Sequence, residues 1–149
     1  MKMRYPIDST LNTFQKWKEK VTSPNDRSLI DRQISLLEEI KASLTEYGTM
    51  GHKMKSFEKL LSDPWMENQI AYDQLYSAWK ELKESYAKEI GAMTVNERLC
   101  HMGLMDEFER VTRSPEKMRS VLHSAFLSHD NTEAIINKYK AQQGGGANV

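Results

Sequence analysis

The stretch TVNERLCHMGLMDEFERVTRSPEKMRSVLHSAF, residues 94–126, decides the fold class because it contains two helix starts and the apolar residues that follow them. Thr94 and Glu97 have the spacing of a capping box, in which the threonine side chain bonds to a backbone N–H of the first helical turn. Ser114 and Pro115 form a second start, since serine is a preferred N-cap and proline loses no hydrogen bond at the first helical position. The stretch therefore predicts two consecutive helices.

Apolar residues recur at helical spacing behind both caps. They are Val95, Leu99, Cys100, Met102, Leu104, Met105, Phe108 and Val111 in the first helix, and Met118, Val121, Leu122, Ala125 and Phe126 in the second. The wide stripe of the first helix is typical of a helix with neighbours on more than one side. We interpret Gly103, inside this helix, as a close approach to a neighbouring helix of the same chain, and Cys100 as a buried structural thiol.

Two longer helices precede this stretch, at about 26–47 and about 64–90. The first follows a cap at Asn25 or Asp26, and the second begins at Pro64 after Asp63. Their apolar stripes are Ile30, Leu37, Ile40, Leu44 and Tyr47 in the first, and Tyr72, Leu75, Trp79, Leu82, Tyr86 and Ile90 in the second. Both stripes have the period of an α-helix, and the second predicts the longest helix of the chain.

Shorter apolar patterns predict a first helix capped by Asp8 or Ser9, a short helix around Phe57, and a last short helix ending near Tyr139. No stretch alternates like a strand. We therefore predict an all-α fold, a helical bundle built on the two long helices, with a smaller C-terminal helical lobe. The expected division is a bundle region at 1–92, a lobe at 93–141 packed on it, and a disordered Gly-rich tail at 142–149.

The composition gives no sign of a membrane or of an extracellular environment. The 21 basic and 21 acidic residues balance, and a single cysteine excludes an internal disulfide. No apolar run is long enough to span a bilayer, and no apolar segment follows the basic residues at the N-terminus. The expected location is the cytoplasm.

The residues that could carry chemistry do not form a recognisable catalytic or metal-binding pattern. Cys100 and the adjacent His101 point about 100° apart on a helix, so they do not share an ion. Asp106, Glu107 and Glu109 have arginines within one turn, which favours pairs along the helix over acid–base catalysis. We therefore predict no metal, no cofactor and no enzymatic activity. A third possible role is that of a small enzyme. Its active site would use the side chains of Glu97, His101, Asp106 and Glu107, which would have to converge in one pocket.

Three features indicate binding. Trp65 and Tyr76 lie off the main apolar row of the long helix, and tryptophan and tyrosine dominate protein interfaces. Together with the acidic cluster Asp106, Glu107 and Glu109, they are the candidate partner-binding residues. A basic end on the first helix favours an alternative role as a nucleic-acid-associated regulator; it consists of Lys2, Arg4, Lys16, Lys18 and Lys20. Recognition modules for nucleic acid are not visible, so this role ranks second.

Residues 93–136 resemble a group of short bacterial proteins with the motif TVNERL…GL(L/M)DEF, here Asn96-Glu97-Arg98-Leu99 and Gly103–Phe108. The resemblance implies a bacterial, intracellular helical lobe, and some members of the group lie beside toxin or mobile-element genes. It implies no activity and no site residue.

The leading hypothesis is a non-catalytic protein that binds another protein, with a toxin-neutralising immunity protein or a similar small inhibitor as the favoured subclass. The expected partner is a protein, with a toxin as the favoured kind, and a homodimer is left open. The motivation is the wide apolar stripes and the surplus aromatic residues, which offer contact surface.

Overall fold

The computed structural model describes residues 4–44, 46 and 48–147, and within these ranges the chain is all-α, as predicted. No strand occurs among the residues described. The eight helices are α1 (Arg4–Lys20), α2 (Pro24–Ser43), α3 (Met50–Ser62), α4 (Gln69–Ile90), α5 (Val95–Met102), α6 (Met105–Arg110), α7 (Pro115–Ser124) and α8 (His129–Ala147). None of these helices is both long and apolar enough to cross a membrane.

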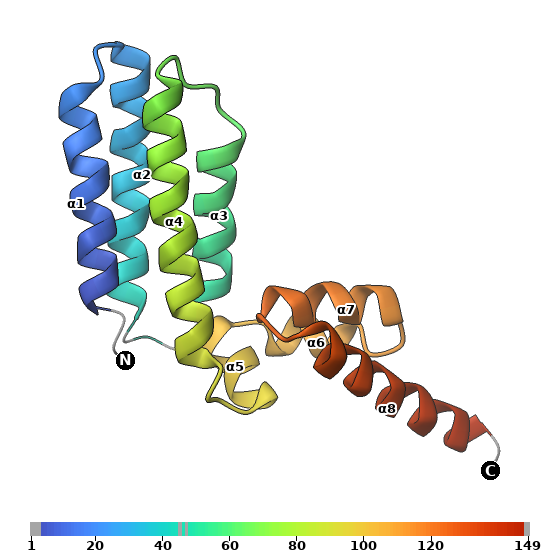
Figure 1. Cartoon of the computed structure of the whole chain (residues 1–149). Helices are drawn as coiled ribbons and strands as arrows, with labels where there is room; N and C mark the ends of the chain where they lie inside the picture. Colours follow the sequence, from blue (N-terminus) through green and yellow to red (C-terminus); the bar gives the residue numbers. More distant parts are fainter. Residues whose placement is uncertain (1–3, 45, 47, 148–149) are drawn as a thin grey trace.

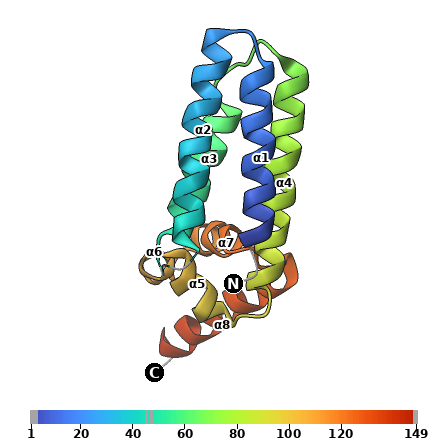
Figure 2. The same cartoon turned by 90° about the vertical axis from the view of Figure 1, so that its left-hand side faces the viewer.

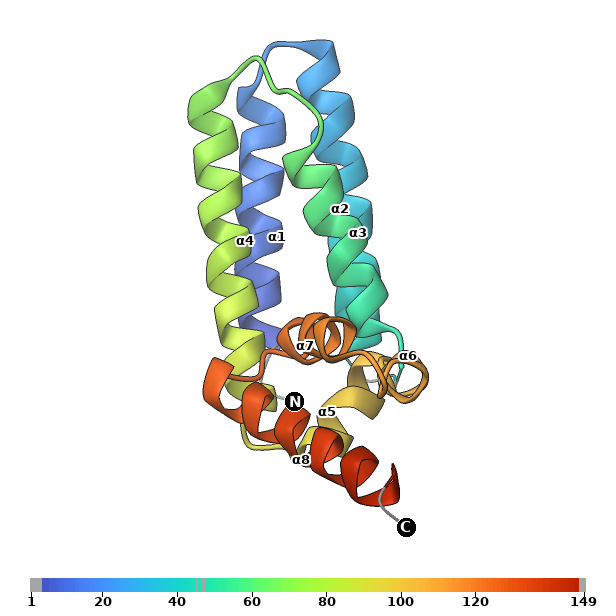
Figure 3. The same cartoon turned by 90° about the vertical axis from the view of Figure 1, so that its right-hand side faces the viewer.

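Helices α1 to α4 run up and down as a four-helix bundle, and α5 to α8 form a smaller lobe at its lower end (Figures 1 and 2). Close backbone contacts join α1 to α2, α2 to α3 and α1 to α4. On the fourth side of the bundle, the α3 and α4 ribbons stand further apart (Figure 3). This fourth side carries the groove described below.

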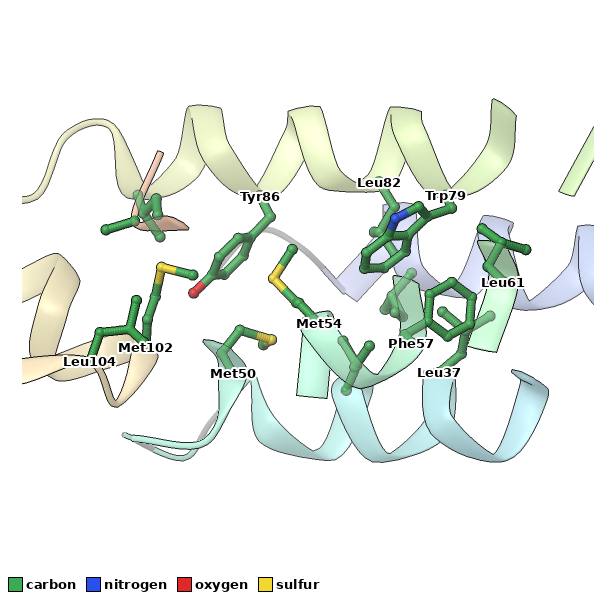
Figure 4. Packing of buried hydrophobic residues seen from close by; sticks show 14 of the residues in the cluster. Leu37, Met50, Met54, Phe57, Leu61, Trp79, Leu82, Tyr86, Met102 and Leu104 are labelled. Carbon is green, nitrogen blue, oxygen red and sulfur yellow. The ribbon is translucent and has the colours of Figure 1, made fainter. Parts of the chain in front are cut away.

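The apolar core is continuous from the bundle into the lobe (Figure 4). Inside the bundle, the ring of Phe57 lies 5.7 Å from that of Phe14 and 4.4 Å from that of Trp79, between centroids. Towards the lobe, Tyr86 and Met102 extend the same core. Burying each such side chain contributes about 1.5–3 kcal/mol, so the core explains why the lobe is held against the bundle.

The two caps predicted in the lobe are confirmed. The Glu97 N–H donates to the Thr94 hydroxyl oxygen at 3.2 Å, and the Lys117 N–H donates to that of Ser114 at 3.4 Å. Pro115 is the first residue of α7. Local signals were sufficient here because both partners of each cap lie within three residues.

The predicted starts of the earlier helices are wrong. Helix α1 begins at Arg4 and not after Asp8 or Ser9. Helix α2 is capped by Ser23, whose side chain accepts from the Asp26 N–H, and Pro24 is its first residue. Serine followed by proline is the same signal that starts α7, and it takes precedence over the later Asn25 and Asp26.

Asp26 is buried, and its carboxylate fixes the start of a different helix. Its two oxygens accept from the N–H groups of Glu67 and Asn68, each at 3.0 Å. The Asn68 side chain in turn caps α4 by accepting from the Ala71 N–H at 2.9 Å. Helix α4 therefore begins at Gln69, and the predicted start at Pro64 is wrong because these contacts hold the preceding residues in a loop.

Gly103 ends a helix, so the prediction of one continuous helix over this region is wrong. Its φ is +74°, and the Leu104 N–H donates to the Leu99 carbonyl at 2.8 Å, the Schellman arrangement with glycine at the left-handed position. A Cβ on Gly103 would lie 2.1 Å from the Gly48 carbonyl oxygen. The close approach is within the chain, as expected, but the neighbour is the turn before α3 and not a helix.

Two further expectations are corrected. Cys100 is exposed and not a buried thiol. The tail predicted to be disordered at 142–149 is helical as far as Ala147, and residues 148–149 lie outside the described residues. The Gln143 side chain donates to the Thr112 carbonyl at 2.9 Å, and the Tyr139 ring packs edge-on against Phe108 at 5.6 Å. These contacts hold α8 against α6 and the residues that follow it, and extending an existing helix needs no new nucleus.

Candidate functional site

A groove follows the open side of the bundle between α3 and α4 and ends against the lobe. Its upper hollow has a volume of about 340 Å³ and is lined by Glu58, Tyr76, Trp79, Lys80, Lys83, Glu84, Ala87 and Phe126. Its lower hollow, of about 400 Å³, is lined by Gly51, Met54, Lys55, Glu58, Lys83, Met102, Leu104, Ser120, His123, Ser124 and Phe126. Because the two hollows share Glu58, Lys83 and Phe126, we treat them as one site, the α3–α4 groove.

A polar bridge crosses the groove from α3 to α4. Glu58 on α3 forms an ion pair with Lys83 on α4, and its Oε1 accepts from the indole N–H of Trp79 at 3.2 Å. The paired carboxylate and ammonium are partly exposed, so the ion pair itself adds little stability. The bridge instead fixes the positions of a buried indole and two charged groups on the groove floor.

Phe126 lies where the two hollows meet, and its backbone is strained. Its φ is +62°, the left-handed conformation that glycine usually adopts at the end of a helix. The Leu127 N–H donates to the Leu122 carbonyl at 3.2 Å, so α7 ends in a Schellman motif with phenylalanine in the glycine position. A residue other than glycine costs about 1–2 kcal/mol there.

Neighbouring groups hold Phe126 in place. Its ring lies 5.9 Å from that of Tyr86, edge to face, and the Lys83 ammonium is 5.9 Å from its centroid. Its carbonyl accepts from the Arg98 guanidinium at 3.2 Å, and the same guanidinium also donates to the Gly91 carbonyl. The chain thus places an aromatic ring in the groove despite the backbone strain, and such strain is often found at functional sites.

Directly behind the groove, a buried hydrogen bond joins the bundle to the lobe. The Tyr86 hydroxyl and His101 Nδ1 are 2.8 Å apart, and the two residues are only 1% and 4% exposed. Burial raises the pKa of Tyr86 and lowers the pKa of His101, because both charged forms lose hydration. Figure 4 shows the Tyr86 ring beside Met54 and Met102, which line the lower hollow.

The structure separates the five predicted partner-binding residues. Tyr76 is 44% exposed and lines the groove. Trp65 is 68% exposed but lies in the loop between α3 and α4, at the end of the bundle far from the lobe (Figure 1). Asp106, Glu107 and Glu109 are on α6 in the lobe. Of the five, therefore, only Tyr76 belongs to the groove.

The four residues considered for an enzymatic role make different contacts or lie on different helices. Glu97 accepts from the Thr94 hydroxyl at 2.9 Å, and His101 contacts Tyr86, while Asp106 and Glu107 lie on the next helix. The described residues contain no group of three or more histidine, cysteine, aspartate or glutamate side chains that could hold a metal ion.

The basic end of α1 is partly neutralised. Lys18 forms an ion pair with Asp31, and the Lys20 ammonium lies 4.9 Å from the Trp17 ring centroid. The side chains of Lys2 and Arg4 lie outside the described residues.

Sequence reasoning missed most of the groove. It assigned Phe126 to the apolar face of a helix, and it gave no role to Glu58 or Lys83.

No known protein family, curated protein or solved structure matches this chain. The chemistry of the groove itself is then the only guide: its lining combines apolar side chains, the exposed ring of Tyr76 and charged groups of both signs. Those properties suit a peptide or protein surface.

Proposed function

We propose that this chain is a non-catalytic protein that binds another protein through the α3–α4 groove. The observation that carries the proposal is Phe126, an aromatic residue held in a glycine-type conformation in the middle of a groove. If the ring were needed only to pack the lobe, glycine at position 126 and an aromatic residue at a neighbouring position would do so with less backbone strain. A ring needed as part of a contact surface gives a direct reason for its position.

Tyr76 supports the same proposal from the rim of the groove. Its ring stacks on that of Tyr72, with 6.0 Å between centroids. A tyrosine that is already held in place loses little side-chain entropy on binding, and exposed tyrosines are frequent energetic anchors of interfaces. A partner that covers Tyr76 and reaches Phe126 would bury both rings.

The favoured role within this class is neutralisation of a toxin, as an immunity protein or a similar small inhibitor in the bacterial cytoplasm. Its support is the resemblance of residues 93–136 to proteins of which some are encoded beside toxin genes. The acidic residues Asp106, Glu107 and Glu109 on α6 would then be a second, separate contact surface. The nucleic-acid alternative gains no support from α1, where Lys18 and Lys20 already have partners.

The test is photo-crosslinking in the native cell with p-benzoylphenylalanine at position 76, and at position 70 as a matched control. Ile70 is 70% exposed on the same helix but does not line the groove. We expect one stoichiometric protein adduct from position 76 and none of that mass from position 70. Light scattering should show a complex of the purified pair. The absence of any adduct specific to position 76 would contradict the proposal.

A further inference from the structure

The α3–α4 groove also indicates what kind of segment it would accept. Its walls are two helices whose backbone groups are satisfied within each helix, so the groove offers no strand edge for an extended peptide. A groove between helices is the usual receptor for the apolar face of an amphipathic helix. The lining on α4 extends from Tyr76 to Ala87, about 17 Å at 1.5 Å per residue, which matches a helix of about three turns.

The charges along the groove favour one sign of partner. Glu58 and Lys83 neutralise each other. Lys55 on the α3 wall and Lys80 on the α4 wall form no ion pair within the described residues. The remaining acid of the lining is Glu84, which lies one helical turn from Lys88 as well as from Lys80. The lining therefore has three lysines, Lys55, Lys80 and Lys83, against two glutamates, Glu58 and Glu84, and a net charge of +1. The two walls therefore each present a lysine to the occupant.

We infer that the groove binds an amphipathic α-helix of a partner protein, about three turns long, whose apolar stripe is flanked by acidic residues. The inference rests on the proposed function and specifies its partner. The apolar stripe lies over Tyr76 and Phe126, and the acidic flanks face Lys80 on one side and Lys55 on the other. Charge complementarity of this kind sets specificity more than it sets affinity.

The experiment uses two synthetic, fluorescein-labelled, helix-stapled peptides of 16 residues. They share a leucine stripe and differ only in flanks of glutamate or lysine. Fluorescence anisotropy is measured with the wild-type chain, Lys55→Glu/Lys80→Glu, Tyr76→Ala and, as a control outside the groove, Ile70→Ala. Circular dichroism of every variant shows that it is folded.

We expect the glutamate-flanked peptide to bind the wild-type chain at least tenfold more tightly than the lysine-flanked peptide. The double charge reversal should invert this preference, Tyr76→Ala should weaken binding of the glutamate-flanked peptide at least tenfold, and Ile70→Ala should leave it unchanged. Added salt should reduce the preference. No saturable binding, equal affinity for both peptides, or a preference that survives the double reversal would overturn the inference.

The outcomes separate this inference from the proposed function. If the peptides fail but position 76 still yields a stoichiometric crosslinked partner, the chain is a protein-binding protein whose partner has other chemistry. If light scattering shows a dimer that Tyr76→Ala abolishes, the groove is occupied by a second copy and the inference is wrong.

Discussion

The backbone conformation of Phe126 and the contacts of its ring have opposite effects on stability. In the left-handed conformation a Cβ clashes with the following carbonyl group, and glycine avoids that clash. The ring of Phe126 nevertheless packs on Tyr86 and faces Lys83. The position therefore balances a backbone cost against contacts of the side chain, and the two contributions can be separated by substitution.

Phe126→Gly is expected to be more stable than Phe126→Ala by about 1 kcal/mol, because both lose the ring but only alanine keeps the strain. Urea denaturation measures the difference. Ser124, in helical conformation at the end of α7, is the matched control, and there glycine should be less stable than alanine by a similar amount. The same order at both positions would contradict the assignment of strain to Phe126.

Burial of His101 should make the stability of the fold depend on pH. Burial lowers the pKa of His101 in the folded state below the unfolded value of about 6.5. As the pH falls below that value, the unfolded chain therefore binds more protons than the folded chain does. Its contribution to stability is therefore complete above pH 6.5 and is lost as the pH falls towards the lowered pKa. The urea midpoint should decrease from pH 7.5 to pH 5.5 more in the wild type than in His101→Gln.

The exposed His52 provides the control for this pH effect. His52→Gln should keep the pH dependence of the wild type. If His101→Gln loses as much stability as the wild type over the same pH range, protonation of His101 does not oppose folding.

At the scale of elements, Asp26 links two helices that are distant in the sequence. It lies in the first turn of α2, and its carboxylate receives the backbone N–H groups that precede α4. Asp26→Ala would leave two N–H groups without their acceptor and should destabilise the fold by about 3 kcal/mol. Asp26→Asn, which keeps one acceptor oxygen, should lie between the alanine variant and the wild type in chemical denaturation.

Asp31 is the matched control on the same helix, since its carboxylate forms an exposed ion pair with Lys18. Asp31→Ala should cost less than about 1 kcal/mol. Equal losses for Asp26→Ala and Asp31→Ala would show that the hydrogen bonds to the loop are unimportant.

The elements that the sequence predicted well are those whose signals are local. The stripes of α2 as far as Ile40 and of α4, and the caps at Thr94 and Ser114, could be recognised because each depends on residues a few positions apart. Helix α2 ends at Ser43, so Leu44 of the predicted stripe lies beyond it, and Tyr47 lies outside the described residues. The start of α4 depends on Asp26, about 40 residues earlier in the chain, and no local pattern contains that information. Gly103 carried a local signal that was interpreted as helix interior when it marked a helix end.

The groove was harder to predict for a related reason. Tyr76 could be chosen because it lies off the apolar row of its own helix. Glu58, Lys83 and Phe126 come from three elements, and each looks ordinary in its own segment. Their relation appears only when α3, α4 and the end of α7 are brought together. Trp65 was chosen on the same ground as Tyr76, but it lies in the loop before α4, where the helical row does not apply. The acidic candidates on α6 were chosen by residue type, which does not report spatial proximity.

At the scale of the whole molecule, the contact between Gly48 and Gly103 helps to hold the lobe on the bundle. The Gly48 N–H donates to the His101 carbonyl at 3.0 Å, and both glycines have positive φ. Gly103→Ala would force a Cβ against the Gly48 backbone and should cost about 3 kcal/mol or more. Gly48→Ala meets no atom within 4 Å and should cost only about 1 kcal/mol, from its backbone conformation.

Thermal or urea denaturation of the two alanine variants tests this difference. Equal destabilisation would show that steric fit between the turn and the lobe does not matter. A loss of near-UV circular dichroism at low denaturant in Gly103→Ala alone would locate the damage at the junction.

The exposure of Cys100 has a practical consequence. It is the sole sulfhydryl of the chain and lies on α5, whereas all three indoles, Trp17, Trp65 and Trp79, lie in the bundle region. A thiol-reactive dye attached there would accept Förster transfer from tryptophan without any engineered mutation. The transfer efficiency would then report, in real time, whether the lobe swings away from the bundle when a partner docks.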